Sequence, residues 1–353
     1  MSILTKYILI RYLKSFFLIL ISLEIFFVLI DFLQNTAHLP NSANLQILYI
    51  FYTSFFTFSI TLPLSLVFAF IVVMVGFVKQ NNMTSFYSLG IKPLNILMPI
   101  IWCSIAITLI LILLQTTPLA YSYEQKSRIL NNSYFTTVQE NIFLKYNEYF
   151  IYFEKLFPLQ KKANNIRIFK TEHNNIIEII IGKKAYYENN KWYVLDTKII
   201  KKPITINWDS SKLTIGYKKL LYTLEGFKPK IINNVSRANI QFSIKDAIYT
   251  ILLLDKQNLD TQKIRAILYS QVIIPFFVIP LIVIIFFFTT VSSREFNVAK
   301  FSSVSIFFTL IIWGIIYFLQ KLAFNGVILA ELATILPIII LYGFAYYIYK
   351  KRV

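Results

Sequence analysis

Charged residues, histidine, glycine and cysteine are all scarce in this sequence. Only 15% of its 353 residues are charged and 57% are hydrophobic, whereas an ordinary soluble domain carries about 25% charged residues. With a mean hydropathy of +0.61, this composition excludes an ordinary soluble protein and predicts an integral membrane protein. The single cysteine, Cys103, excludes an intrachain disulfide, so any domain outside the membrane must fold by side-chain burial alone.

Motifs for catalysis and nucleotide binding are also missing. The two histidines, His38 and His173, belong to no H-E-x-x-H motif, and we interpret both as solvated loop residues. Gly182-Lys183 lacks the upstream glycine of a P-loop, so the chain cannot bind ATP in that way. We therefore predict no catalytic residue, no metal site and no cofactor. Any energy from ATP must come from a partner.

Positive charge exceeds negative charge, and the net charge is +18. Much of the excess lies in a polar, lysine-rich insert in the middle of the chain. It reflects either a composition biased towards Ile, Lys, Asn, Tyr and Phe or a surface that tolerates anionic lipid or phosphate. We expect no nucleic-acid partner.

Long apolar runs on both sides of the insert predict six membrane spans, since each crossing needs about 20 apolar residues. The first run follows basic residues as in a signal peptide. It is too long for one and lacks an Ala-x-Ala site, so we expect a retained helix. The predicted spans are Ser15–Leu33, Phe55–Val78, Leu94–Thr116, Ala266–Thr289, Phe301–Gln320 and Ile328–Tyr349. The predicted domains are a first transmembrane half (1–117), the insert (118–262) and a second transmembrane half (263–353).

Basic residues in the short loops predict the orientation of the spans. Those that fall on one side are Lys6, Arg11, Lys14, Lys79, Lys92, Arg294, Lys300, Lys350, Lys351 and Arg352. On the other side, Gln34–Leu48 has no Lys or Arg and the turn after the fifth span has only Lys321. We therefore expect both termini in the cytoplasm and the insert outside it, because long domains cross the membrane regardless of their charge.

The insert carries two predicted helices and a long β pattern. The helices are Leu119–Asn131 and Ser243–Asn258, the second with Ser243 and Asp246 as an N-capping pair. Between them, short runs rich in Ile, Tyr, Phe, Val and Thr are broken by Asn-Asn, Asp-Ser-Ser and glycine, and Gly182 separates the runs IIEIII and AYYEN. Residues 188–191 read as a hairpin turn. We expect about eight to ten antiparallel strands in a sandwich, jelly roll or curved open sheet. Its apolar face is either the core of the domain or a cradle for acyl chains.

Two carboxyl groups lie in the first span. Glu24 is at its middle, where an acid costs about 2.5–3.5 kcal/mol on insertion scales. Asp31 follows seven residues later, on nearly the same helix face. Both are expected to face a cavity or a partner helix. They are either lining residues of a gate or structural residues paired with hydroxyl groups or a lysine.

Ordered stretches along the chain resemble the LptF/LptG family. KYILIRYLKSFFLILISL followed by IDFLQN resembles the first span and its exit, and TLPLSLVFAFIVVMVGFVKQNNMTSFYSLGIKP resembles the second span and the coupling segment. KKAYYENNKWYVLD resembles the β-domain signature, and SQVIIPFFVIP, GIIYFLQK and FNGVILAELATILP resemble the last three spans. The resemblance covers nearly the whole chain. IDFLQN favours LptG over LptF.

This resemblance implies a fold and a function. The fold is an integral membrane α-helical protein with six transmembrane helices, three on each side of an extracytoplasmic antiparallel β domain that is β-jellyroll-like. The function is that of a permease subunit of an ABC transporter, which extracts lipopolysaccharide from the bacterial inner membrane and passes it to a periplasmic bridge. The implied partners are a cytoplasmic ABC ATPase dimer, a paralogous permease of the LptF/LptG pair, a single-span periplasmic bridge protein similar to LptC, and lipopolysaccharide.

The resemblance also implies two sets of site residues. The lateral gate and lipid path would use Glu24, Asp31, Phe32, Gln34, Asn35, Tyr317, Gln320 and Lys321. The ATPase-coupling loop, 79–92, would use Asn81, Asn82, Phe86, Tyr87 and Gly90. Two positions depart from the family. Asn82 stands where an acid is common, and Gln34–His38 lacks the basic residues that contact lipid phosphates. Phosphate contact would then fall to Lys321, which could instead pair with Glu331, or to the partner subunit.

Three other functions were weighed. A secondary transporter usually has glycine- or proline-broken spans in inverted repeats, and the scarce glycine and the large insert argue against it. A membrane enzyme lacks its motifs here. A scaffold that only displays a β domain is disfavoured by Glu24 and Asp31 inside a span. Co-purification with a cytoplasmic ATPase separates the four.

Overall fold

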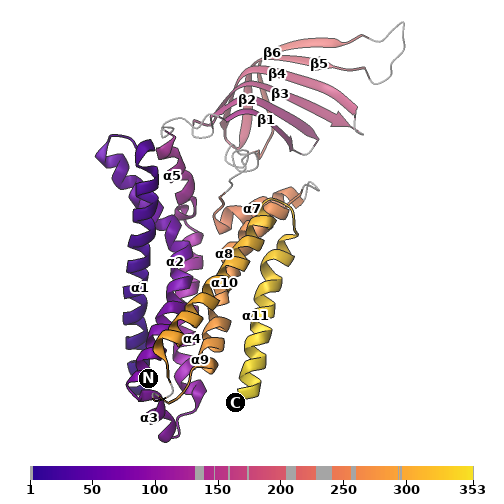
Figure 1. Cartoon of the computed structure of the whole chain (residues 1–353). Helices are drawn as coiled ribbons and strands as arrows, with labels where there is room; N and C mark the ends of the chain where they lie inside the picture. The colour runs from indigo at the N-terminus through magenta and orange to yellow at the C-terminus, as the bar shows by residue number, and fades with distance from the viewer. Residues whose placement is uncertain are drawn as a thin grey trace. The chain divides into compact units, whose positions relative to one another are not determined.

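The chain forms two compact units (Figure 1). The computed structural model describes residues 3–131, 139–146, 148–157, 160–172, 175–203, 212–227, 241–255, 260–292, 294 and 296–352. The helical unit comprises residues 1–131, 242–255 and 260–353, and the strand unit comprises 132–241 and 256–259. His173 and the end of the predicted helix Ser243–Asn258 lie outside the described residues. The functional domain limits given above stay predictions.

The helical unit contains the predicted membrane spans. Within the described part of the chain, five single helices are long and apolar enough to cross a membrane. They are α1 (Ile3–Asn35), α2 (Ala43–Lys79), α4 (Pro93–Gln115), α10 (Val298–Phe324) and α11 (Ala330–Arg352). The remaining span is broken into α8 (Gln262–Val272), the 3-10 turn η3 (Ile274–Phe277) and α9 (Val278–Phe288), with a bend of 44°. The helix breaks at Pro275, because proline has no N–H to continue the helical hydrogen bonding.

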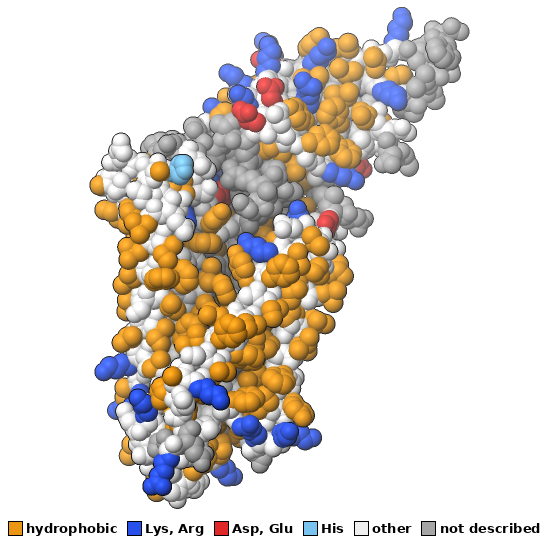
Figure 2. Space-filling model, in the orientation of Figure 1, with side chains coloured by type: hydrophobic (Ala, Val, Ile, Leu, Met, Phe, Trp, Pro, Cys, Tyr) orange, Lys and Arg blue, Asp and Glu red, His pale blue; other side chains and the backbone are white. Residues whose placement is uncertain are grey.

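Helices α1, α2 and α10 are longer than the predicted spans. The α2 helix has 37 residues, which at a rise of about 1.5 Å per residue exceeds the roughly 30 Å of hydrocarbon. The ends of α1 and α2 therefore reach beyond the apolar layer or tilt within it. Figure 2 shows hydrophobic side chains over the middle of the helical unit and Lys and Arg side chains at its end that holds the termini. This distribution is typical of a membrane-spanning bundle.

Short helices connect and extend these spans. They are η1 (Thr36–His38), α3 (Asn82–Ser88), η2 (Pro118–Tyr121), α5 (Ser122–Leu130) and α7 (Ile244–Asp255). The helix predicted over Leu119–Asn131 is thus a 3-10 turn followed by α5, separated from α4 because Pro118 cannot continue the helix. At the start of α7 the Asp246 N–H donates to Ser243 Oγ at 3.2 Å. This bond confirms the predicted cap.

The strand unit contains one antiparallel sheet. Its described strands follow chain order and are β1 (Gln139–Tyr146), β2 (Tyr149–Phe157), β3 (Lys162–Glu172), β4 (Asn175–Glu188), β5 (Lys191–Lys201) and β6 (Thr214–Thr223). Of the three arrangements weighed, the described strands form the curved open sheet (Figure 1). The predicted hairpin is confirmed: Asn189 and Asn190, at φ 49° and 65°, join β4 to β5 in the left-handed region that a two-residue turn requires.

The described strands are fewer and longer than expected. The sequence pattern divided residues 175–188 at Gly182, but β4 runs through this glycine without a break. A Cβ atom on Gly182 would lie 2.0 Å from Val194 Cγ1 of β5. The glycine is therefore needed for close approach between strands, and it marks no turn.

The apolar side chains of the sheet form a buried cluster. Phe153 and Trp192 are fully buried, with ring centres 5.4 Å apart. The Trp192 Nε1–H donates to the Phe227 carbonyl at 2.6 Å, which satisfies the indole while it is removed from water. This cluster, which includes Ile151, Ile166 and Val194, is the core of the strand unit.

Candidate functional site

Glu24, at the middle of α1, faces α2. The Thr61 hydroxyl donates to Glu24 Oε2 at 2.7 Å, and the Thr57 hydroxyl donates to Glu24 Oε1. Thr61 is fully buried. The hydroxyl groups lie one helical turn apart on α2, so a single face of that helix receives both carboxyl oxygens. The sequence singled out Glu24, and the structure adds its partners.

Asp31 lies seven residues after Glu24, on nearly the same face of α1. Its Oδ1 accepts a hydrogen bond from the Tyr49 hydroxyl of α2, and its Oδ2 accepts one from the Lys126 ammonium of α5. The Lys126 and Asp31 side chains are only 8% and 23% exposed. Both acids of the first span thus face neighbouring helices of the same chain, with hydroxyl and lysine partners.

The other predicted residues at the end of α1 have different surroundings. Asn35 Nδ2 donates to the Asp31 carbonyl at 2.8 Å, one turn back on the same helix. The Phe32 ring lies 6.4 Å from that of Tyr49, and Gln34 is exposed. Leu33, between them, is 70% exposed. This end of α1 therefore offers an apolar and uncharged polar surface beside the buried carboxylate.

The predicted residues of α10 form a separate cluster. Tyr317 stacks on Trp313 with ring centres 5.5 Å apart, and the Lys321 ammonium lies 5.2 Å from the Tyr317 ring centre. Gln320 is half-buried and Lys321 is exposed. The pairing of Lys321 with Glu331 is not found. Glu331 instead accepts a hydrogen bond from Arg265 Nη1 of α8 at 2.9 Å, and no ion pair of Lys321 occurs among the residues that the structure describes.

The predicted coupling residues lie within α3 and at its two ends, and three of them contact the helical bundle. Asn82 Nδ2 donates to the Tyr7 hydroxyl of α1 at 3.0 Å, and the Phe86 ring packs edge-on to Phe77 of α2 at 5.8 Å. Tyr87 packs against the buried cluster of the bundle, and burial raises the pKa of its hydroxyl. Asn82, Phe86 and Tyr87 therefore attach α3 to the bundle.

The two remaining predicted residues of this segment shape its backbone. Asn81 precedes α3 at φ 59°, and Gly90 follows it at φ 74°. The Gly90 N–H donates to the Tyr87 carbonyl at 3.0 Å, a helix ending that favours glycine. Leu89, which the sequence reading did not select, is 76% exposed. In the sequence, its position between Ser88 and Gly90, two residue types common in turns, was the signal for an exposed leucine.

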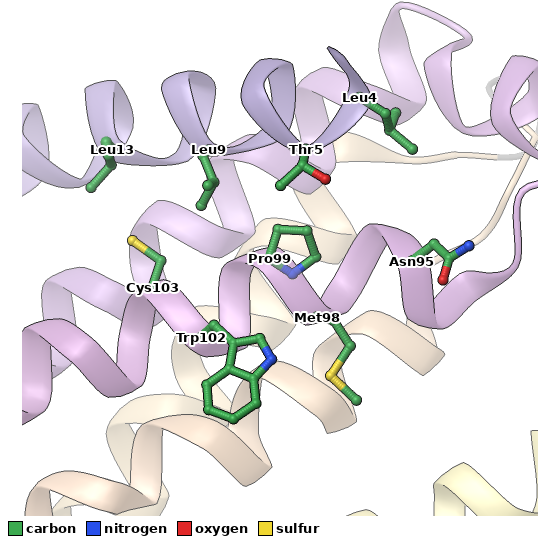
Figure 3. Close-up of a pocket in the computed structure, with 9 residues that line it drawn as sticks. All are labelled: Leu4, Thr5, Leu9, Leu13, Asn95, Met98, Pro99, Trp102 and Cys103. Carbon is green, nitrogen blue, oxygen red and sulfur yellow. The ribbon is translucent and has the colours of Figure 1, made fainter. Parts of the chain in front are cut away.

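A groove between α1 and α4 was not predicted either. Figure 3 shows side chains of both helices directed into it. It has a volume of about 650 Å³. The lining residues are Leu4, Thr5, Leu9, Leu13, Asn95, Met98, Pro99, Trp102 and Cys103. Cys103 here is one member of a mostly apolar wall.

The described residues bring no group of three or more His, Cys, Asp or Glu side chains close enough to hold a metal ion. Several polar groups of the helical unit, among them the Glu24 and Asp31 carboxylates, instead accept hydrogen bonds from neighbouring helices. Such an arrangement can set the geometry of a membrane path.

Comparison with known families finds one match that spans the chain. The family described as "Lipopolysaccharide export system permease LptF/LptG" matches residues 6–351. No curated protein matches the sequence.

Proposed function

Because the chain belongs to the LptF/LptG family of lipopolysaccharide export permeases, we propose that it is a permease subunit of an ABC transporter. In this proposal it extracts lipopolysaccharide from the inner membrane and passes it to its strand unit and then to a periplasmic bridge. The observation that carries the proposal is the extent of the family match, which includes both helical halves and the strands between them. The choice of LptG over LptF stays a prediction.

The protein is a multi-pass protein of the inner membrane. We place its termini and α3 in the cytoplasm and its strand unit in the periplasm. The distribution of basic residues supports this orientation, since α11 ends with Lys350, Lys351 and Arg352 and such residues favour the cytoplasmic side.

The lipid path is proposed to begin at the outer end of α1. Phe32, Leu33 and Gln34 offer an apolar surface with a polar rim there. The cluster of Tyr317, Gln320 and Lys321 on α10 is separate and uses other contacts. This separation supports a gate in which α1 of one permease faces α10 of its paralogue. Lys321 is the proposed contact for a lipid phosphate, because it is exposed and has no ion pair among the described residues.

Energy for transport is proposed to come from a cytoplasmic ABC ATPase dimer that docks on α3. Asn82, Phe86 and Tyr87 attach α3 to the bundle. A displacement of α3 by the ATPase would therefore move α1 and α2 directly. Leu89 supplies an exposed apolar anchor for the ATPase. Leu89→Asp should abolish co-purification of the ATPase, whereas Ser88→Asp at the neighbouring position should weaken it less.

The strand unit is proposed to receive the lipid and to continue into an LptC-like bridge protein. On β6, which lies at one edge of the sheet that the described strands form, Ile215 and Leu220 are 50% and 42% exposed, while Leu221 packs against the buried cluster. An edge strand with exposed apolar side chains is a surface that another chain or an acyl chain can cover. The buried core of the sheet gives it rigidity, and the edge gives it access.

Photo-crosslinking tests the proposal. A photoreactive amino acid replaces Phe32 in one variant and Leu221 in another, in the intact complex with ATPase and ATP. Lipopolysaccharide adducts at both positions are expected. Their absence at both would exclude the proposed function. Solute uptake driven by a proton gradient without an ATPase would instead favour a secondary transporter.

A further inference from the structure

Three segments of the helical unit meet at one buried ion pair. The Lys126 ammonium of α5 donates to Asp31 Oδ2 of α1, while the Tyr49 hydroxyl of α2 donates to Asp31 Oδ1. Tyr49 is fully buried, and the Lys126 side chain is only 8% exposed. A lysine is almost never buried without such a partner. The pair therefore joins α5 to two helices that are distant from it in the sequence.

Aromatic rings complete the surroundings of the ammonium. Lys126 Nζ lies 5.6 Å from the ring centre of Tyr49 and 5.7 Å from that of Phe56 on α2. Ring faces within about 6 Å attract a cation. The Phe56 ring also contacts Tyr123 of α5, with centres 5.1 Å apart. The contact between α5 and α2 is thus both charged and apolar, and it fixes where α5 lies.

The place of α5 in the chain gives this contact its meaning. It ends at Leu130, and the next described residues begin β1 of the strand unit at Gln139. After the strand unit the chain returns to the helical unit at α7. Any force that the helices exert on the strands β1 to β6 through the covalent chain therefore passes through α5 or α7.

The two flanking segments are joined to each other. The Tyr121 hydroxyl, just before α5, donates to Asp246 Oδ2 of α7. Burial, and then the Asp246 carboxylate itself, raises the pKa of Tyr121, so this hydroxyl stays a neutral donor. Gln271 Nε2 of α8 donates to the Phe242 carbonyl at 2.8 Å, just before α7. The connection from α1 through α5 thus extends to the second half of the bundle.

We propose that Asp31, Tyr49 and Lys126 form a strut that makes α5 move with α1 and α2, so that closure of the helices is transmitted to the strand unit. This inference rests on the proposed function. A buried ion pair contributes little net stability compared with apolar side chains of the same size, so stability alone does not explain it. Lys126 is a positioning residue, which acts on the lipid only through the place of α5.

The experiment replaces the ion pair by a covalent tie that can be made at will. In a Cys103→Ser background, Asp31→Cys and Lys126→Cys are combined, and the two thiols are joined with dibromobimane or left free. The intact complex carries a photoreactive amino acid at Leu221. The measured quantities are lipid adducts per ATP hydrolysed and the hydrogen exchange of α5 amides with and without ATP.

Without dibromobimane, adducts per ATP should fall about tenfold, within the range by which residues of a coupling network change coupling. Joining the thiols should restore them. Equal yields with free thiols and in the parent, or no recovery on joining, would overturn the strut. Asn131→Ala is the matched control, because the Asn131 side chain is exposed at the end of α5 and bonds Ser127 of α5 itself at 3.4 Å. Its adduct yield should match that of the parent.

The exchange measurement separates this inference from the proposed function. A parent that gives adducts neither at Leu221 nor, in a separate variant, at Phe32 rejects the function. The strut predicts that ATP changes α5 exchange in the parent and in the joined variant, and leaves it unchanged with free thiols. Identical ATP responses in all three would reject the strut whatever the lipid result.

Discussion

The helical unit and the strand unit carry similar ion pairs in opposite surroundings. In the helical unit, Lys126 and Asp31 are 8% and 23% exposed and connect different helices. In the strand unit, Lys155 and Glu140 are 47% and 57% exposed and connect adjacent strands that backbone hydrogen bonds already join. The first pair determines the position of an element. The second pair adds a contact between strands whose positions the sheet and its apolar core already determine.

The same contrast holds for the groups that need special geometry. In the helical unit the demanding positions are polar, such as Glu24 against Thr57 and Thr61. In the strand unit the position with the strictest requirement is Gly182, where Val194 leaves no space for a side chain. A membrane bundle gains little from apolar contacts alone, because lipid tails are as apolar as its side chains. Specific polar contacts therefore carry more of its geometry.

The largest predicted effect on stability is that of Lys126→Met. Removing the ammonium leaves the half-buried Asp31 carboxylate without its counterion, which should cost about 3 kcal/mol, the low end of the range for breaking a buried pair. Thermal unfolding in detergent should show a lowered midpoint. Asp31→Leu combined with Lys126→Met should recover most of the loss. A single variant as stable as the parent would break the contrast between the two units.

Gly182→Ala should have the next largest effect. The new Cβ would meet Val194 Cγ1 at 2.0 Å, and such overpacking typically costs about 1–3 kcal/mol. Adding Val194→Ala removes the clashing methyl group, so the double variant should lose less than the sum of the single variants. Denaturant unfolding followed by hydrogen exchange of β4 and β5 amides measures this. Strict additivity would contradict the steric account.

Thr61→Val should destabilise the helical unit by about 1 kcal/mol, the ordinary net contribution of a buried hydrogen bond. It keeps the side-chain shape and removes the donor to Glu24 Oε2. Ser59→Ala is the control on the same helix, since the Phe56 carbonyl is the one partner of the Ser59 hydroxyl among the described residues. The control should unfold at a higher temperature than Thr61→Val. The reverse order would count against a structural role for the Glu24 contacts.

The smallest effect is expected from Lys155→Met in the strand unit. Its exposed pair with Glu140 has a distance of 3.4 Å, and exposed pairs contribute about 0–1 kcal/mol. The unfolding midpoint should barely move, and added salt should change it little. A loss comparable with that of Lys126→Met would show that exposure does not separate the two pairs.

Sequence patterns were sufficient for features that depend on local composition. Hydropathy located the spans, and Asn189-Asn190 and Ser243 located a turn and a cap, because each acts through neighbouring residues. The partner of Asp31 was beyond reach, since Lys126 lies 95 residues away and several lysines of the insert were equal candidates. Gly182 was interpreted as a break between strands, because the close approach of Val194 that requires a glycine exists only when β5 lies beside β4. The coupling residues were selected without knowing which face of α3 the bundle covers.

The proposed function requires that lipid moves from the helical unit to the strand unit when ATP is hydrolysed. The direct measurement compares lipopolysaccharide adducts at Phe32 and at Leu221 in one complex, before and after ATP is added. Adducts at Phe32 should form before ATP, and adducts at Leu221 should appear only afterwards. Equal adducts at Leu221 with and without ATP would contradict transfer driven by the ATPase.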